Sequence, residues 1–192
     1  MILVFATNNL HKIEEIRNAV GRKLEIKCLK DIGCFDDLPE THLTIKENAE
    51  EKARFVYDKY RCNCFADDTA LEIDSLNGEP GVFSARYAGT HCSFDDNINL
   101  VLKKMHHVKI RTCKFRTVIA LIMNGDVQFF EGIVRGSIAK KRSGVEGFGY
   151  DPVFIPDGYK ISFAEMSLEE KNKISHRAMA IREMVKYLRK NL

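Results

Sequence analysis

The first 29 residues constrain the fold of this chain more than any other stretch. An apolar, β-branched run over residues 2–6 is typical of a buried strand, and residues 24–29 alternate as a second strand does. Between them, apolar residues over positions 10–20 recur with the period of a helix, which we expect Gly21 to end. A strand, a helix and a strand in this order predict an α/β protein, with helices packed on a sheet.

The rest of the chain keeps alternating between helical and extended patterns. Thr44 begins a capping-box pattern, which predicts a helix that ends near Tyr60. An apolar stretch over residues 62–66 predicts a third strand, which we expect to stop at Asp67 and Asp68. Further helices are expected after Ser93, Ser167 and Ser175, and strands over residues 114–123 and 127–134, joined by a hairpin turn at residues 124–126.

Length and charge narrow the class of protein. The 192 residues suit one domain over residues 1–192 that is built from two lobes. A formal net charge of only +3 argues against a binder of nucleic-acid polymers. The longest apolar runs are far too short to span a bilayer, and no basic, apolar leader opens the sequence. We therefore expect a cytoplasmic protein with neither a membrane nor a nucleic-acid polymer as its partner.

The cysteines do not predict a metal site. Their spacing is irregular and includes no Cys-x-x-Cys pair, so the ligand pattern of a zinc site is missing. We expect reduced thiols that pack in the interior. The six are Cys28, Cys34, Cys62, Cys64, Cys92 and Cys113.

The segment from Thr7 to Lys12 lies where the first strand gives way to the first helix. A helix N-terminus presents free N–H groups and a partial positive charge, which suits a phosphate. Thr7 and Asn8 add polar donors, and Lys12 adds a charge one turn into the helix. This is no Walker loop, because the glycines and the Gly-Lys-Ser/Thr ending are missing. A plain helix cap with a solvated lysine is the alternative.

Two adjacent acids, Asp67 and Asp68, follow the third strand, with Thr69 next in sequence. Neighbouring carboxylates repel each other unless a positive charge lies nearby. Mg²⁺ prefers carboxylate and phosphate oxygens, and Glu40 in an acidic loop is a plausible further ligand. Ligands in α/β proteins also collect at strand ends. The alternative is a set of solvated turn residues.

Basic residues gather before and at the start of the last helix. Lys171 precedes Ser175, which we expect to cap a helix with His176 and Arg177 in its first turn. Cations at that end of a helix oppose the helix dipole, so an anion or a keto oxygen in front of the turn would offset the cost. Arginine can also read two acceptors on a purine at once. A surface helix with basic decoration is the alternative.

The segment over residues 144–154 combines glycines with aromatic rings. Its three glycines allow positive φ and a close approach to a ligand, and Phe148 and Tyr150 between them look exposed. Asp151 and Pro152 follow. A pliable aromatic loop suits stacking on a nucleobase, whereas a glycine-rich turn with two buried rings is the alternative. Combined with an acidic pair and two helix starts, this loop indicates a nucleoside phosphate bound with a metal.

The same motifs, in this order, resemble those of the inosine triphosphate pyrophosphatases, which act on non-standard purine nucleoside triphosphates. The resemblance covers nearly the whole chain. It runs through Phe5-Ala-Thr-Asn-Asn-Leu-His-Lys12, Leu38-Pro-Glu-Thr41, Glu47-Asn-Ala-Glu-Glu-Lys-Ala53, Ala66-Asp-Asp-Thr69, Pro80-Gly-Val-Phe-Ser-Ala-Arg-Tyr87, Gly147-Phe-Gly-Tyr-Asp-Pro-Val-Phe154, Ala164-Glu-Met, Glu170-Lys171 and Ser175-His-Arg177.

The resemblance implies a fold, a reaction and an assembly. The fold would be a mixed, elongated central sheet flanked by helices, with two lobes and a cleft between them. The enzyme would hydrolyse ITP, dITP, XTP and dXTP to the monophosphate and pyrophosphate with Mg²⁺, cleansing the nucleotide pool, and would form a homodimer.

The resemblance also implies roles for individual residues. Asp68 would be the general base, and Glu40, Asp67 and Asp68 would bind the metal. The triphosphate would be held by Thr7, Asn8, Asn9, Leu10, His11, Lys12 and Lys52, with Thr69 as a further substrate contact. The nucleoside would be held by Phe148, Gly149, Tyr150, Asp151, Lys171, His176 and Arg177.

Two positions depart from the pattern of that family. Ala70 stands where glycine is frequent, and His42 stands where glycine often follows the Glu-Thr pair. These changes bear on substrate preference more than on the class of reaction. Two other functions remain open: a Maf-like pyrophosphatase of modified nucleotides, whose motifs differ from those here, and a non-catalytic nucleotide-binding module.

Overall fold

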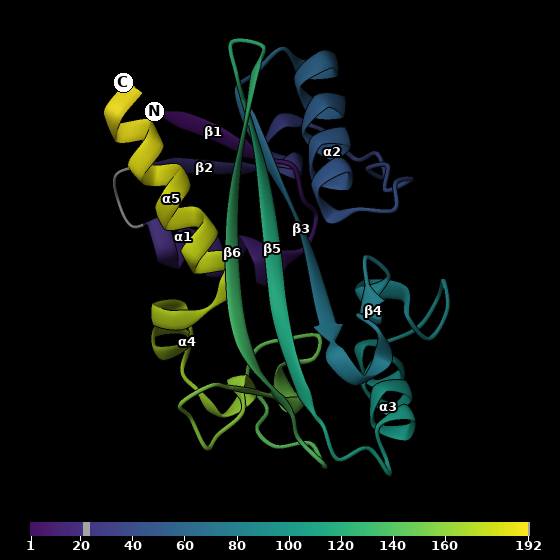
Figure 1. The fold of residues 1–192 in the computed structure, drawn as a ribbon. Coiled ribbons are helices and arrows are strands. Elements are labelled where there is room, and N and C mark those ends of the chain that lie inside the picture. The colour runs from purple at the N-terminus through teal and green to yellow at the C-terminus, as the bar shows by residue number, and fades with distance from the viewer. Residues whose placement is uncertain (21–23, 192) are drawn as a thin grey trace. The chain divides into compact units, whose positions relative to one another are not determined.

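A computed structural model describes residues 1–20 and 24–191 of the chain. It is an α/β protein in which the described strands form one mixed sheet in the order β2-β1-β3-β5-β6-β7, with β4 paired to β3 (Figure 1). The strands are β1 (Ile2–Phe5), β2 (Glu25–Cys28), β3 (Cys64–Ile73), β4 (Pro80–Gly81), β5 (Thr112–Met123), β6 (Asp126–Ile138) and β7 (Phe154–Pro156). β1 runs parallel to β2 and β3, whereas β4 and β7 run antiparallel to β3 and β6. The predicted fold class is therefore confirmed.

The helices begin where the sequence predicts them. They are α1 (Leu10–Val20), α2 (Ile45–Tyr60), α3 (Phe94–Lys104), α4 (Leu168–Ile174) and α5 (His176–Asn191), with short 3₁₀ turns between them. Ser93 and Ser167 cap α3 and α4 through reciprocal bonds with Asp96 and Glu170. The predicted helix end at Gly21 lies outside the described residues. No helix in the described ranges is long and apolar enough to cross a membrane.

The chain divides into two compact units. Unit 1 comprises Met1–Asp68, Thr117–Gly132 and His176–Leu192, and unit 2 comprises Thr69–Arg116 and Ile133–Ser175. Three strands, β3, β5 and β6, contribute residues to both units. The cleft that the resemblance implies stays a prediction.

The sheet of unit 1 carries helices on both faces (Figure 1). Successive strand residues point to opposite faces, and two apolar clusters follow that alternation. Phe5 and Phe65 stack, with ring centroids 4.6 Å apart, in the cluster that includes α1 and α5. Their neighbours Val4 and Ala66 belong to the cluster that includes α2. In β1 and in the unit 1 part of β3, odd-numbered residues therefore face α1 and α5, and even-numbered residues face α2.

Unit 2 has an aromatic core of its own. Phe154 lies between Phe115 and Phe163, with ring centroids 4.6 and 5.0 Å away. Helix α3 adds Ile98 and Val101 to the same cluster. The hairpin that joins β5 to β6 turns as predicted.

Two local predictions are corrected. The third strand does not stop at Asp67 and Asp68, because β3 continues through both of them. A strand tolerates acids in its interior when each carboxylate has a cation on its own face, as described below. The second correction concerns the capping box at the start of α2. The Thr44 hydroxyl accepts from the Glu47 N–H (3.2 Å) as predicted. The Glu47 carboxylate, however, accepts from the Thr44 hydroxyl (2.7 Å), where a capping box has it accept from the Thr44 backbone N–H.

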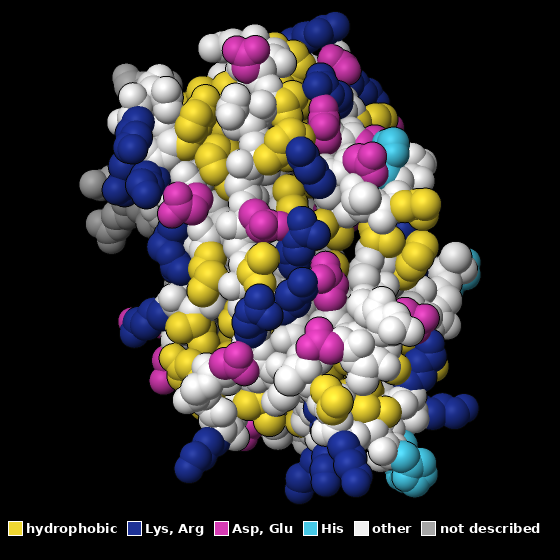
Figure 2. Space-filling view, viewed as in Figure 1, with side chains coloured by type: hydrophobic (Ala, Val, Ile, Leu, Met, Phe, Trp, Pro, Cys, Tyr) yellow, Lys and Arg dark blue, Asp and Glu magenta, His cyan; other side chains and the backbone are white. Residues whose placement is uncertain are grey.

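The surface mixes charges of both signs. On the face drawn in Figure 2, basic and acidic side chains are interspersed with apolar ones. This distribution agrees with the small net charge of +3 and shows no broad single-sign field on that face.

Candidate active site

Asp67 is held by cations on the face of the unit 1 sheet that α1 and α5 cover. Its carboxylate accepts a bond from Lys12 Nζ at 2.8 Å and one from Arg177 Nε at 2.9 Å. The Arg177 guanidinium also pairs with Glu15, which lies three residues after Lys12 in the middle of α1. The four side chains form a continuous network of two acids and two bases, in which Lys12 is half-buried and the other three are buried.

Charge explains why this network is stable away from water. Burial alone would raise the pKa of Asp67, but the charges of Lys12 and Arg177 outweigh it and hold that pKa well below the ordinary value. Burial would likewise lower the pKa of Arg177, but Asp67 and Glu15 raise it. Burial lowers the pKa of Lys12, and Asp67 opposes that shift. The network thus matches two acids with two bases.

The first helical turn places Lys12 in this network. The Lys12 N–H donates to Asn9 Oδ1 (3.2 Å), and the Asn9 N–H donates to Thr7 Oγ1 (3.2 Å). These bonds fix the start of α1 as a capping residue does. Thr7 is buried, whereas Asn8, Leu10 and His11 are exposed.

Asp68 belongs to the opposite face, under helix α2. Its Oδ1 lies 3.2 Å from Lys52 Nζ, which also donates to Glu40 Oε1 at 2.6 Å. The other oxygen of Asp68 accepts from Asn48 Nδ2 at 3.4 Å. The structure thus brings the predicted residues Glu40, Lys52 and Asp68 together around one ammonium group.

This group places two carboxylates around one ammonium, whereas the network around Asp67 has two acids and two bases. Burial raises the pKa of Asp68, and the charge of Lys52 opposes that shift only in part. Burial would lower the pKa of Lys52, but Asp68 and Glu40 outweigh it and raise the pKa. Both carboxylates thus bond the Lys52 ammonium, and the charge of Lys12 also acts to lower the pKa of Asp68.

The donor set fits a hard divalent cation. Glu40 and Asp68 present carboxylate oxygens that both bond Lys52 Nζ, and Mg²⁺ is held in proteins by one or two carboxylates plus water and substrate phosphates. Asp67, the third predicted ligand, is instead engaged by Lys12 and Arg177 on the other face. Among the described residues, no group of three or more His, Cys, Asp or Glu side chains is arranged to hold a metal.

In unit 2, Asp151 shapes the glycine-rich loop. Its Oδ2 accepts from the Phe148 N–H (2.8 Å) and from Lys171 Nζ (2.5 Å). At Gly147, φ is +73°, and a Cβ there would lie 2.1 Å from Asp151 Oδ2. Only glycine allows the backbone to pass this close to the carboxylate. The shape of the loop therefore depends on Gly147 and on the bonds of the buried Asp151 carboxylate to Phe148 and Lys171.

The two rings of this loop lie in different environments. Tyr150 is only 4% exposed, packs in the unit 2 core and donates its hydroxyl to the Ser84 carbonyl at 2.9 Å. The expectation that Tyr150 is exposed is therefore wrong, because its ring completes the core. Phe148 is half-buried, with the Lys171 ammonium 5.2 Å from its ring centroid and Phe94 6.0 Å away.

The remaining predicted residues are divided between unit 1 and unit 2. His176 is buried at the start of α5 in unit 1, as Arg177 is. Thr69 and Gly149 belong to unit 2 and are half-buried. The predicted basic turn at His176 and Arg177 is thus not surface decoration.

Sequence reasoning missed two polar residues, Glu15 and Asn48. Both are buried, and each bonds a predicted site residue from the adjacent helix. Glu15 lies between Ile13 and Ile16 on the apolar face of α1, a position at which a lone acid signals a buried partner. Asn48 is one turn before Lys52, which puts both on one face of α2.

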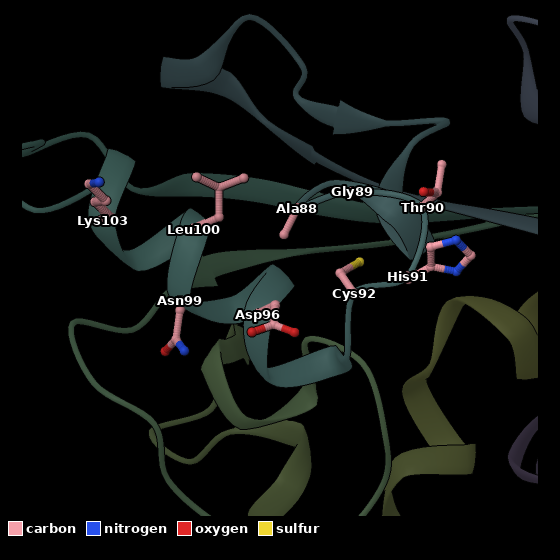
Figure 3. A pocket seen from close by; sticks show the side chains of 9 residues that line it. All are labelled: Ala88, Gly89, Thr90, His91, Cys92, Asp96, Asn99, Leu100 and Lys103. Carbon is pink, nitrogen blue, oxygen red and sulfur yellow. The ribbon is translucent and has the colours of Figure 1, made fainter.

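A cavity of about 650 Å³ in unit 2 involves none of the predicted residues (Figure 3). Helix α3 forms one wall, and the loop from Ala88 to Cys92 forms another. It is lined by Ala88, Gly89, Thr90, His91, Cys92, Asp96, Asn99, Leu100 and Lys103. The cavity is lined by neither an acid pair nor a Phe, Tyr or Trp ring, so we assign it no part in the chemistry.

Solved structures with this fold include proteins of one family. The chain is similar to the Ham1 protein of Staphylococcus aureus, with a TM-score of 0.89, 34% identity and full coverage of both chains. It is also similar to a HAM1 protein from Coxiella burnetii, with a TM-score of 0.89, 33% identity and 99% coverage of each chain.

Sequence comparison reaches the same family. A dITP/XTP pyrophosphatase of Christiangramia forsetii is 50% identical over 190 residues, which cover 99% of this chain and 100% of that protein. One of Porphyromonas gingivalis is 51% identical over 187 residues, covering 97% and 96%. The family model of Ham1 matches residues 3–187. Since the match spans both units and every motif above, this chain belongs to the Ham1 family.

Proposed function

We propose that this protein hydrolyses ITP, dITP, XTP and dXTP to the monophosphate and pyrophosphate. The observation that carries the proposal is that Glu40 and Asp68 come together on the ammonium group of Lys52. The relatives named dITP/XTP pyrophosphatases support the choice of substrate. Membership of the Ham1 family makes a Maf-like enzyme the weaker alternative.

Unit 1 provides what the triphosphate requires. Glu40 and Asp68 would hold Mg²⁺, which neutralises charge on the phosphate oxygens and acidifies bound water. Lys52 and the start of α1 with Lys12 would bind phosphate oxygens. Asp67 would not touch the metal in this proposal; it would hold Lys12 and Arg177 in place.

The reaction is in-line attack of water on the α-phosphorus. The bond from the water oxygen to phosphorus forms while the bond to the bridging oxygen of pyrophosphate breaks. Asp68 Oδ1 or Oδ2 takes the proton of the water, and a carboxylate whose pKa burial has raised is a better base for this step. Pyrophosphate leaves with the electron pair of the broken bond.

Unit 2 provides the contact for the base. Phe148, half-buried at the loop, is the ring we assign to stacking on the purine, whereas Tyr150 anchors the loop to the core. Selection of a 6-keto purine needs an N–H donor to O6. Adenine would then place a donor against a donor, which costs roughly 1–3 kcal/mol.

The test is a nucleotide panel assayed for pyrophosphate release with Mg²⁺ and then with EDTA. ITP and XTP should give pyrophosphate at rates well above GTP and ATP, and EDTA should abolish release. Equal kcat/KM for ITP, GTP and ATP would contradict the substrate assignment. Nucleotide binding with no turnover would instead identify a non-catalytic module.

The assembly and the cellular location belong to the same proposal. The protein would act as a cytoplasmic homodimer, as the family resemblance implies. Light scattering coupled to gel filtration should give about twice the 22.0 kDa mass of one chain. A mass of one chain at micromolar concentration would refute the dimer.

A further inference from the structure

We propose that Asn48 is a positioning residue for the pair of carboxylates Glu40 and Asp68. Its side-chain amide fixes the loop that carries Glu40 at a set distance from Asp68. The inference rests on the proposed metal-dependent reaction and deepens it, because it assigns the residue that sets the spacing of the cation ligands.

The amide of Asn48 is fully committed to three bonds. The His42 N–H donates to Asn48 Oδ1 at 2.8 Å, and Asn48 Nδ2 donates to the His42 carbonyl at 3.2 Å. Nδ2 also donates to Asp68 Oδ2 at 3.4 Å. Because a backbone N–H faces the amide oxygen, the NH₂ group must face His42 O and Asp68. The side chain is 0% exposed, so water does not compete for these bonds.

These bonds join two chain segments that hold the ligands. His42 follows Glu40 by two residues, so pairing both of its backbone groups anchors the loop just beyond the Glu40 carboxylate. The anchor uses the backbone of His42, so it does not depend on the side chain at that position. Asp68 lies on β3, at the third bond of the same amide.

Helix geometry places Asn48 and Lys52 next to each other, so both can contact Asp68. The two residues are four apart on α2 and share a face. Lys52 binds the carboxylates of Glu40 and Asp68, while Asn48 binds the loop and Asp68. Glu51 also bonds Thr41 in this loop, so loss of Asn48 would loosen the loop without freeing it. Mg²⁺ tolerates little error in ligand distance, so we expect a loosened loop to bind the cation more weakly.

The chain contains a matched control, Asn97. This asparagine is also buried at the start of a helix and also braces a loop, since its Oδ1 accepts from the Ala88 N–H at 2.8 Å and its Nδ2 donates to the Ala85 carbonyl at 3.1 Å. It belongs to unit 2, and its side chain bonds the backbone of Ala85 and Ala88 and the thiol of Cys92. Replacing it removes the same kind of bonds without touching the proposed cation ligands.

The experiment compares Asn48→Leu with Asn97→Leu in the full-length protein. Binding of Mn²⁺ to the nucleotide-free protein is followed by electron paramagnetic resonance, and hydrogen exchange is measured over residues 40–43. We expect Asn48→Leu to raise the Mn²⁺ dissociation constant about 10-fold or more, and to speed exchange in that segment. Asn97→Leu should change neither, although it also lowers the melting temperature. Asn48→Ala replaces Asn48→Leu if the leucine variant does not fold.

Activity then separates the inference from the function on which it rests. With ITP, Asn48→Leu should need about 10-fold more Mg²⁺ for half-maximal rate, and added Mg²⁺ should restore most of kcat. A wild type that releases no pyrophosphate would overturn the proposed function, while the Mn²⁺ and exchange results would still decide the role of Asn48. Equal Mn²⁺ affinity in the wild type and Asn48→Leu, or no Mn²⁺ binding by the wild type, would overturn the positioning role.

Discussion

Asp67 and Asp68 are consecutive residues of β3, yet their carboxylates lie on opposite faces of the sheet and bind different cations. Asp67 bonds Lys12 and Arg177, and Asp68 bonds Lys52. The alternation of a strand imposes this separation. One acid is thereby held in a network of two acids and two bases, while the other shares one ammonium group with Glu40.

The two acids should therefore respond oppositely to loss of charge. In EDTA at pH 7, Asp67→Asn should lower the free energy of unfolding by about 3–5 kcal/mol, because Lys12 and Arg177 lose a buried partner. For a chain of this size that corresponds to a fall in Tm of roughly 10 °C. Asp68→Asn should leave Tm unchanged or raise it, because burial disfavours its charge and Lys52 keeps Glu40.

The sign of the Asp67 contribution also fixes its pH dependence. The folded-state pKa is lowered, so the stability it contributes is present above the unfolded-state pKa and is lost as pH falls through the folded value. Thermal melts of wild type and Asp67→Asn should therefore converge at strongly acidic pH. Curves that stay parallel down to acid unfolding would contradict the assignment.

Asp68→Asn should remove activity while it preserves the fold. The substitution keeps the shape of the side chain and removes the base and a cation ligand. We expect kcat for ITP to fall by about 10²-fold or more, equivalent to about 2.7 kcal/mol of transition-state stabilisation. Steady-state kinetics with saturating Mg²⁺ give the value, and a variant within a few-fold of wild type would refute the general-base role.

Glu15 should prove energetically coupled to Arg177. It is buried and pairs with the guanidinium, although no motif includes it. A double-mutant cycle with Glu15→Gln and Arg177→Met should give a coupling energy of about 1–3 kcal/mol from urea unfolding. Additive effects within experimental error would mean that the pair contributes nothing.

Substitutions of Phe148 and Tyr150, the two rings of the unit 2 loop, should affect different properties: substrate binding for Phe148 and stability for Tyr150. Phe148→Leu should raise KM for ITP about 10-fold, since stacking on a base is lost, and should change Tm little. Tyr150→Phe removes only the bond to the Ser84 carbonyl, so it should cost about 0.5–1.5 kcal/mol of stability with a smaller effect on KM. The reverse pattern would show that Tyr150 contacts the base.

Gly132 should be intolerant of even one added methyl group. A Cβ there would lie 2.0 Å from the His176 carbonyl oxygen and 2.7 Å from the Ala180 nitrogen. Backbone atoms of α5 cannot move aside alone, so Gly132→Ala should cost about 1–3 kcal/mol and displace Arg177. Thermal melts and ITP kinetics check both effects, and wild-type values in each would show that β6 can shift.

Local patterns were sufficient for most of the elements. Capping residues predicted the starts of α3, α4 and α5, and the hairpin turn predicted the link between β5 and β6. The error at β3 has a physical cause: two adjacent acids are unfavourable in a buried strand unless cations reach them. Those cations come from α1, α2 and α5, which are remote in sequence, so no local window contains them.

The sequence by itself determined the α/β class, the family and most of the polar residues of the candidate site. Tertiary structure alone decided how those residues divide. In the folded protein, Asp67 bonds Lys12 and Arg177, whereas Asp68 bonds Lys52 and Asn48. Tyr150 is buried in the core. Motifs record which side chains are present, whereas partners depend on which face of a strand and which helix meet. That pairing exists only once the sheet and its two helical layers are packed.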